Sequence, residues 1–384
     1  MTFEFLEPVD VDLQETIQSF SNQSLASFVT FYNGEEEINY KDNNLAFICI
    51  KDARLSVYKE KSDFFYDDIR LELYQMYVGN WNLNILDLGN IQMGDEVSDT
   101  AYVLKSTLNY LYSKSVIPIL LGGGQDFTYH QYRAYDGIKY MVNLAVADFK
   151  FDLGNSDLPL QSQSYVGKMI TAEPYNLFNY CNLGYQTHHS SREEIDLMEK
   201  LFFESVRLGE LKQDFKKVEP ILRDSDLFSL DMYSVKSSEI ADSGHKTVNG
   251  FDALELCQLC RYAGMSDKLS SFGLYELQAL SKSESLIQLV SQMIWYFIEG
   301  YSLRLNEKVT EESPYFIKYS VPIEEEVLVF LKSEASQRWW IKIPNANNNY
   351  SKPSLLPCDE QDYIEATAAQ LPERWLKAKY KNNM

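Results

Sequence analysis

The chain has 384 residues, of which 45% are hydrophobic, enough to bury a large core. This length fits one large α/β domain with an extension, or two domains. The 56 acidic residues outnumber the 35 basic ones and give a formal net charge of −21, so nucleic-acid binding is not expected, because such a surface repels phosphate backbones.

The N-terminal segment, residues 1–42, is polar with a weak helical pattern, and we interpret it as an arm. Its start, MTFEFLEPVD, has neither the basic nor the apolar region of a signal peptide. The longest apolar runs, such as 116–121, have the length of a strand and fall short of the roughly 20 residues that span a membrane. We therefore expect a cytoplasmic protein without a membrane partner.

Apolar strands alternate with amphipathic helices from residue 43 to residue 305. Strands are predicted at 45–51, 83–91, 116–124, 140–148, 178–185, 226–233 and 270–277, and helices at 69–79, 98–114, 192–209, 251–264 and 284–304. Continuous apolar strands separated by helices are typical of a mostly parallel sheet covered on both faces. We predict a three-layer α/β/α sandwich, which binds ligands at the carboxyl ends of its strands.

The helix predicted at 251–264 contains a C-x-x-C pair, Cys257 and Cys260. Residues three apart share one face of a helix, so we interpret the pair as part of the apolar core. The chain has five cysteines, and an odd, sparse set of this kind fits reduced thiols in a cytoplasm.

The pattern changes after residue 305. Antiparallel strands are predicted at 315–321, 325–332 and 338–344, followed by a loop at 345–354 and short helices around 359–370 and 372–380. We predict that residues 306–384 form a C-terminal β-plus-helix extension packed on the main domain, 43–305.

Polar side chains gather where the predicted strands of the main domain end. They are Gln125, Asp148, Asp152, Asp231 and Glu276. Because the carboxyl ends of parallel strands meet at one edge of a sheet, we expect these side chains to lie close together. A single aspartate at a strand end is often a helix cap or a solvated loop residue, but clustered carboxylates are a common site for hard metal ions.

Four motifs in the same order make the sequence similar to the ureohydrolase family, which contains arginase, agmatinase and formimidoylglutamase. The motifs are GGGQDF at 122–127, DFKFD at 148–152, SLDMY at 229–233 and LYE at 274–276. Their family counterparts are G-G-x-H, D-A-H-x-D, S-x-D-x-D and a glutamate that ends a late strand. The resemblance implies an arginase-like fold, and the triple glycine slightly favours formimidoylglutamase.

The resemblance also implies a two-metal hydrolase. In the family, six residues hold two Mn²⁺ ions, and a water that bridges both ions attacks an amidine or guanidine carbon. Both cations are needed, because together they bring the pKa of the water near neutral. Family members commonly form oligomers, so a homo-oligomer with a small-molecule ligand is expected.

Three of the six metal positions depart from the family pattern. Gln125 and Lys150 replace histidines, and Tyr233 replaces an aspartate. The positions assigned by the resemblance are Gln125, Asp148, Lys150, Asp152, Asp231 and Tyr233. The resemblance also assigns substrate contact to Glu276. We place His188 and His189 on a loop near the mouth of the cleft, as further candidates for substrate binding.

Lys150 changes the chemistry of the second metal position most. A charged lysine offers three donors and no acceptor. Unpaired carboxylates in a cleft cost on the order of several kcal/mol, so we infer that the ammonium takes the place of the second ion and pairs with at least two of the three aspartates. We accordingly expect no resident cofactor, or at most one weakly bound Mg²⁺ or Ca²⁺.

Three functions are compatible with these residues. The first is a catalytically impaired pseudoenzyme of the ureohydrolase type that binds a ligand or partner. The second is an active C–N hydrolase with a single metal ion or a site based on Lys150, in which Lys150 and Glu276 are the catalytic candidates. The third is a structural or interaction protein with a vestigial cleft.

Overall fold

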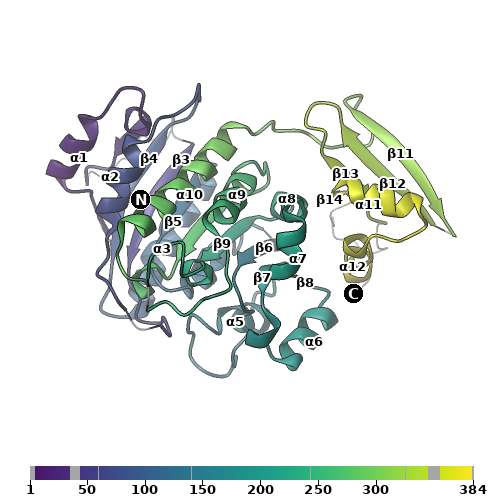
Figure 1. Ribbon diagram of the computed structural model, residues 1–384, viewed down its shortest axis with the longest axis horizontal. Helices are drawn as coiled ribbons and strands as arrows, with labels where there is room; N and C mark the ends of the chain where they lie inside the picture. The colour runs from purple at the N-terminus through teal and green to yellow at the C-terminus, as the bar shows by residue number, and fades with distance from the viewer. Residues whose placement is uncertain are drawn as a thin grey trace.

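A mostly parallel β-sheet organises the chain (Figure 1). This computed structural model describes residues 5–34, 44–58, 60–139, 141–242, 244–324, 326–344 and 355–382. Within these residues the sheet has ten strands: Leu6–Glu7 (β1), Val29–Phe31 (β2), Leu45–Lys51 (β3), Ile85–Gln92 (β4), Ile117–Leu121 (β5), Val142–Ala147 (β6), Leu177–Tyr185 (β7), Glu204–Arg207 (β8), Leu227–Asp231 (β9) and Ser271–Tyr275 (β10). Their order is β1-β4-β3-β5-β10-β9-β6-β7-β8, with β2 beside β4, and only the β1–β4 pairing is antiparallel.

Helices cover both faces of the sheet, which confirms the predicted three-layer sandwich. One face packs against Val11–Gln18 (α1), Tyr66–Gln75 (α2), Leu208–Gln213 (α7), Val218–Arg223 (α8), Ala253–Gly264 (α9) and Glu284–Ser302 (α10). The other face packs against Val97–Ser113 (α3), Phe127–Arg133 (α4), Tyr165–Thr171 (α5) and Arg192–Lys200 (α6). The central strands are buried on both sides, which explains their continuous apolar sequences.

The helix predicted at 192–209 is wrong in its second half. α6 ends at Lys200, and Phe202 has a left-handed backbone with φ of 52°. The chain then forms β8 on the open edge of β7 before α7 begins. The sequence of β8, ESVR, is too short to separate a helix from a strand, and its pairing with β7 decides between them.

The described part of the N-terminal segment adds two strands and one helix to the main domain. β1 pairs with β4 at the register Leu6↔Ile91, and β2 pairs with β4 at Val29↔Ile85. α1 packs its buried Ile17 into the same apolar core as α2. Residues 35–42 lie outside the described part.

The C-terminal extension is an antiparallel sheet with two helices. Among the described residues it consists of Phe316–Ile323 (β11), Glu326–Ser333 (β12), Trp339–Lys342 (β13), Leu355–Cys358 (β14), Glu360–Thr367 (α11) and Glu373–Asn382 (α12). β14 was not predicted, and the predicted loop 345–354 lies outside the described residues. The extension forms its own apolar core around Trp375 and Phe330.

Two arginine contacts fasten the extension to the main domain. Arg223 of α8 donates to the carbonyl oxygens of Trp339 and Cys358, at 3.1 and 3.0 Å. Arg374 of α12 pairs with the buried Glu204 of β8, with Nε 2.6 Å from Oε2. The extension therefore sits beyond β8, as Figure 1 shows in yellow.

No helix in the described parts of the chain is both long and apolar enough to cross a membrane. Cys257 and Cys260 are buried free thiols within α9, as the helical pattern predicted. Burial raises the pKa of the Cys257 thiol to about 12, so it stays protonated in the core.

Candidate metal centre

A glycine turn after β5 delivers Gln125 to the carboxyl edge of the sheet. Gly122 and Gly123 have φ of 88° and 78°, in the region that side chains disfavour. A Cβ on Gly122 would lie 1.6 Å from the hydroxyl of Tyr66, so this position needs glycine. The Gly122 amide donates to the Leu274 carbonyl at 2.7 Å, which ties the turn to the end of β10.

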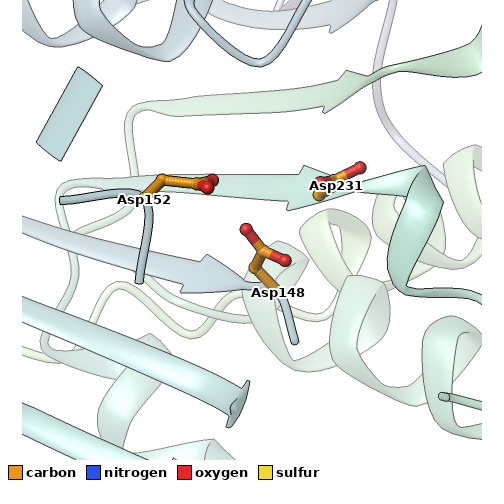
Figure 2. Close-up of side chains that lie close together, drawn as sticks. All are labelled: Asp148, Asp152 and Asp231. Carbon is orange, nitrogen blue, oxygen red and sulfur yellow. The ribbon is translucent and has the colours of Figure 1, made fainter. Parts of the chain in front are cut away.

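Three aspartates meet at this edge, and we refer to Asp148, Asp152 and Asp231 as the aspartate triad. Asp148 directly follows β6, and Asp231 ends the neighbouring strand β9. Asp152 approaches from the loop after Asp148, and the three carboxylates gather in one region (Figure 2). One oxygen from each lies within 4.8 Å of the other two. The predicted clustering of these side chains is therefore present.

The aspartate triad is buried and incompletely hydrogen-bonded. Its members are 0%, 3% and 1% exposed, in chain order. Asp148 Oδ2 and Asp152 Oδ2 have neither a hydrogen-bond donor nor an ion-pair partner among the described residues, whereas Asp231 Oδ1 accepts from the Tyr233 amide at 2.7 Å. Buried polar atoms normally have partners, so these oxygens are positioned for a group other than the chain itself.

Burial and mutual repulsion make the triad hard to ionise without a cation. Burial, then the charges of Asp152 and Asp231, raise the pKa of Asp148 well above its usual value. Burial also raises the pKa of Asp231, and Glu276 and Asp152 add to the shift. A cation bound here would reverse these shifts, because it favours the charged carboxylates.

Gln125 adds one more oxygen that has no donor. Its Nε2 donates to Ser229 Oγ at 2.9 Å and lies 3.4 Å from the hydroxyl of Tyr165. With the amide nitrogen held in this way, Gln125 Oε1 stays buried and unpartnered among the described residues. An amide oxygen is a suitable ligand for a hard cation.

Lys150 lies beside the aspartate triad but pairs with one member only. Its Nζ is 3.3 Å from Asp152 Oδ1, and no ion pair with the other two aspartates occurs within the described residues. The prediction of at least two pairs is therefore wrong. The ammonium lies 5.2 Å from the ring centroids of both Tyr58 and Phe149, and this aromatic contact holds it to one side. Burial lowers the pKa of Lys150, but the triad raises it above the usual value, so the ammonium stays charged.

Two stacked tyrosines cover the lysine side of the site. The rings of Tyr58 and Tyr233 are 3.9 Å apart with 13° between their planes, and His245 packs edge-on against Tyr233 at 4.5 Å. The Tyr58 hydroxyl is buried without a hydrogen-bond partner in the described part of the chain. Burial and then the nearby triad raise the pKa of Tyr58 far above its usual value, so the phenol is neutral. Tyr233, at the position for which the sequence resemblance implies an aspartate, therefore lies in an aromatic stack.

Glu276 is fully buried at the floor of the site. Its backbone is left-handed, with φ of 63°. Glu276 Oε1 accepts from the Gln125 amide at 2.8 Å, and Oε2 accepts from Ser56 Oγ at 2.6 Å. Burial raises the pKa of Glu276 to about 7, although these hydrogen bonds oppose the shift. Ser56 also accepts from the Tyr58 amide at 3.1 Å and so links Glu276 to the tyrosine cover.

His188 and His189 lie in a short 3-10 turn, Thr187–His189, and both are exposed. The His189 ring packs edge-on against Phe149 at 4.9 Å, and the two histidine rings are 4.3 Å apart. Burial, His188 and then Lys150 lower the pKa of His189. The pair therefore borders the site from outside, and its predicted role in substrate binding stays a prediction.

Solved structures share this architecture. Formiminoglutamase from Trypanosoma cruzi, solved with Mn²⁺, matches with a TM-score of 0.65 and 17% identity, over 73% of this chain and 99% of that chain. Formimidoylglutamase from Bacillus subtilis matches with 0.64 and 15%, over 74% and 93%. Agmatine ureohydrolase from Thermoplasma volcanium matches with 0.56 and 19%, over 74% and 96%. This chain has the arginase fold.

Comparison of the sequence alone does not detect this likeness. No family profile matches the sequence, and no curated protein matches it. The resemblance read from the four motifs is confirmed at the level of the arginase fold, because the strands that bear the motifs adopt it.

The expectation that this arginase-fold chain has no resident cofactor is wrong. The aspartate triad is a buried set of oxygen ligands that fits a metal ion, and a structural relative was solved with Mn²⁺. The expectation relied on Lys150 engaging two or more carboxylates, whereas it engages Asp152 alone. Asp148, Asp231 and Gln125 therefore keep oxygens for a cation. The second metal position fits less well, because Lys150 can only donate and Tyr233 is stacked on Tyr58.

Proposed function

We propose that this arginase-fold chain binds one divalent metal ion in the aspartate triad and is catalytically impaired in the two-metal hydrolysis of amidines and guanidines. The observation that carries the proposal is the position of Lys150, whose ammonium lies 3.3 Å from Asp152 at the edge of the triad. A fixed ammonium supplies positive charge at the position where the family has a metal-binding histidine. The protein would then act by binding a small ligand.

The charges at the site favour a single ion. The triad contributes −3 and Lys150 contributes +1, so the net formal charge is −2, which one divalent ion neutralises. A second divalent ion about 4 Å from the first would add a repulsion of roughly 16 kcal/mol at an effective dielectric near 20. Without the ligands that Lys150 and Tyr233 replace, little remains to offset that repulsion.

The residues of the chain have separate parts in ligand binding. Asp148, Asp152 and Asp231 would hold the ion, with Gln125 Oε1 as a further oxygen. A bound divalent ion polarises a coordinated oxygen and lowers the pKa of bound water. Glu276 offers a buried carboxylate to a cationic amidine or guanidine, which suits the pKa near 7 because a cationic ligand would ionise it.

Metal stoichiometry and hydrolysis test the proposal together. We expect one Mn²⁺ per chain after dialysis against excess Mn²⁺, measured by elemental mass spectrometry. We also expect no hydrolysis of arginine, agmatine or formimidoylglutamate by the loaded protein. Two ions per chain, or turnover within about tenfold of the ~10 s⁻¹ typical of enzymes, would contradict the proposal.

A second candidate is an active hydrolase that uses one metal ion. The retained Glu276 favours it, because this fully buried carboxylate sits beside the triad and is held by Ser56 and Gln125. Slow hydrolysis at one ion per chain, lost in Glu276→Gln but kept in the exposed Glu193→Gln control, would support this candidate.

A further inference from the structure

A second pocket opens beside the candidate metal centre, at the carboxyl ends of β7 and β8. Its volume is about 310 Å³, which lies within the range of small-molecule sites. Tyr185, the last residue of β7, pairs in register with Arg207, the last residue of β8, and both line the pocket. The lining also includes Lys236, which follows the turn after β9.

The pocket adjoins the metal centre but is separate from it. Gln186 lines the pocket and donates its amide to the carbonyl of Phe149, at 2.8 Å. Its side chain donates to the carbonyl of Asn249, which also lines the pocket, at 2.7 Å. Phe149 lies between Asp148 and Lys150 in sequence, so this hydrogen bond links the pocket to the backbone of the metal centre, while no member of the aspartate triad lines the pocket. His188 stands at the rim.

The charge of the lining contrasts with that of the chain. The chain has 56 acidic and 35 basic residues, yet three basic residues and no acidic one line this pocket among the described residues. Lys212 is neutralised by Glu255, with Nζ 2.6 Å from Oε2, and by Asp252 at 3.6 Å. Arg207 and Lys236 have no ion pair in the parts of the chain that the structure describes.

Arg207 and Lys236 place two positive charges without an ion-pair partner among the described residues in one cavity, and this arrangement favours the binding of an anion. Arginine binds the planar face of a carboxylate or phosphate with paired hydrogen bonds, and lysine adds a point charge. We propose that this pocket binds a small molecule through a carboxylate or phosphate group held between Arg207 and Lys236. The inference goes beyond the proposed function, because it requires no metal ion and no catalysis.

Calorimetry on the full, chelator-treated chain tests the pocket. The probes are inorganic phosphate and glutarate, and we expect at least one to bind with a dissociation constant below about 10 mM. The Arg207→Gln/Lys236→Gln variant should bind at least about tenfold more weakly, because both charged donors are lost. Binding should also weaken as salt rises from about 50 to 200 mM, because Arg207 is exposed to screening.

A matched variant controls for net charge. Arg192→Gln/Lys200→Gln removes the same two charges from exposed positions on α6, and we expect its affinity to stay within about twofold of the native chain. Binding of phosphate alone would assign a phosphate-type ligand, and binding of glutarate would assign a carboxylate. No binding of either probe by the native chain, or an equal loss in the control, would overturn the inference. Because metal is absent throughout, this result is independent of the stoichiometry experiment.

Discussion

The two sides of the candidate metal centre differ in what their side chains offer. On the aspartate side, Asp148, Asp231 and Gln125 present buried oxygens, and Asp148 Oδ2 and Gln125 Oε1 have no donor among the described residues. On the lysine side, an ammonium and two stacked tyrosines present donors and aromatic faces. The strands that carry both sides are neighbours in one sheet, so the difference arises from side chains and not from the backbone.

This contrast indicates that one metal subsite can be replaced while the other is kept. The aspartate side depends on residues at the ends of β6 and β9, whose positions follow from the parallel sheet. The lysine side depends on packing: Lys150 contacts Tyr58, and Tyr58 stacks on Tyr233. Each side can therefore be tested by substitutions that leave the other intact.

The largest effect is expected when the aspartate side is broken. Asp148→Asn removes a charged ligand oxygen from the centre of the triad, so Mn²⁺ affinity should fall by roughly 1000-fold, more than the ~10–100-fold cost of losing an outer-sphere partner. Titration calorimetry measures this loss. The exposed Asp157→Asn variant removes the same charge elsewhere and should bind as the native chain does. Equal affinity in both variants would mean that the triad holds no metal ion.

Restoring the family residue types at the three departing positions, two on the lysine side and Gln125 on the aspartate side, should add a second ion. The triple variant Gln125→His, Lys150→His, Tyr233→Asp removes the ammonium and supplies the residue types of the family pattern. We expect the Mn²⁺ content to rise from one to two per chain, measured by elemental mass spectrometry. Lys150→Met alone removes the charge without adding a ligand and should stay at one. A triple variant that also stays at one would argue against the residue-by-residue assignment of these positions.

The fold could be predicted where the sequence pattern is long and regular. The strands that end at Asp148, Asp231 and Glu276 were placed within about two residues, because buried parallel strands have continuous apolar sequences. β8 was missed because its four residues, ESVR, are too few to show a period that separates helix from strand. The second half of that predicted helix could only be corrected by its pairing with β7.

The sequence could predict the candidate metal ligands of the site, but not the tyrosines that cover it. Strand ends identify Asp148 and Asp231, whereas Tyr58 and Ser56 lie in a loop without a motif. One signal could have placed Ser56 and Tyr58 near the site: they follow the end of β3, and β3 pairs in parallel with β5, so both strands end at the same edge of the sheet. The single ion pair of Lys150 could not be predicted either, because local packing determines whether a flexible lysine side chain contacts a carboxylate or an aromatic face.

The pH dependence of the free energy of unfolding should distinguish the metal-free form from the metal-bound form. The pKa of Glu276 is raised from 4.5 to about 7, so the folded state binds this proton more tightly than the unfolded state does. The free energy of unfolding of the chelated chain should therefore fall as pH rises from about 4.5 to 7, by about 3 kcal/mol for this group at 1.36 kcal/mol per unit. Asp148 and Asp231 shift in the same direction.

Urea unfolding at several pH values measures this dependence. Glu276→Gln should make it less steep and leave the contributions of Asp148 and Asp231, whereas the exposed Glu193→Gln should not change it. Saturating Mn²⁺ should also reduce the slope, because a bound cation favours the ionised triad. A chelated chain whose stability rises over this range would mean that the buried carboxyls are compensated in some other way.

The smallest effect concerns the hydroxyl of Tyr58. Two substitutions of this residue separate the contribution of its hydroxyl from that of its ring. Because that hydroxyl is buried without a partner among the described residues, Tyr58→Phe should leave the chelated chain equally stable or more stable by up to about 1 kcal/mol. Tyr58→Ala also removes the stack on Tyr233 and the ring beneath Lys150, and it should cost about 2 kcal/mol. If the phenylalanine variant loses as much stability as the alanine variant, the hydroxyl has a partner and the lysine side holds more than an aromatic cover. If neither variant changes Mn²⁺ affinity by more than about threefold, less than 1 kcal/mol, the two sides act independently.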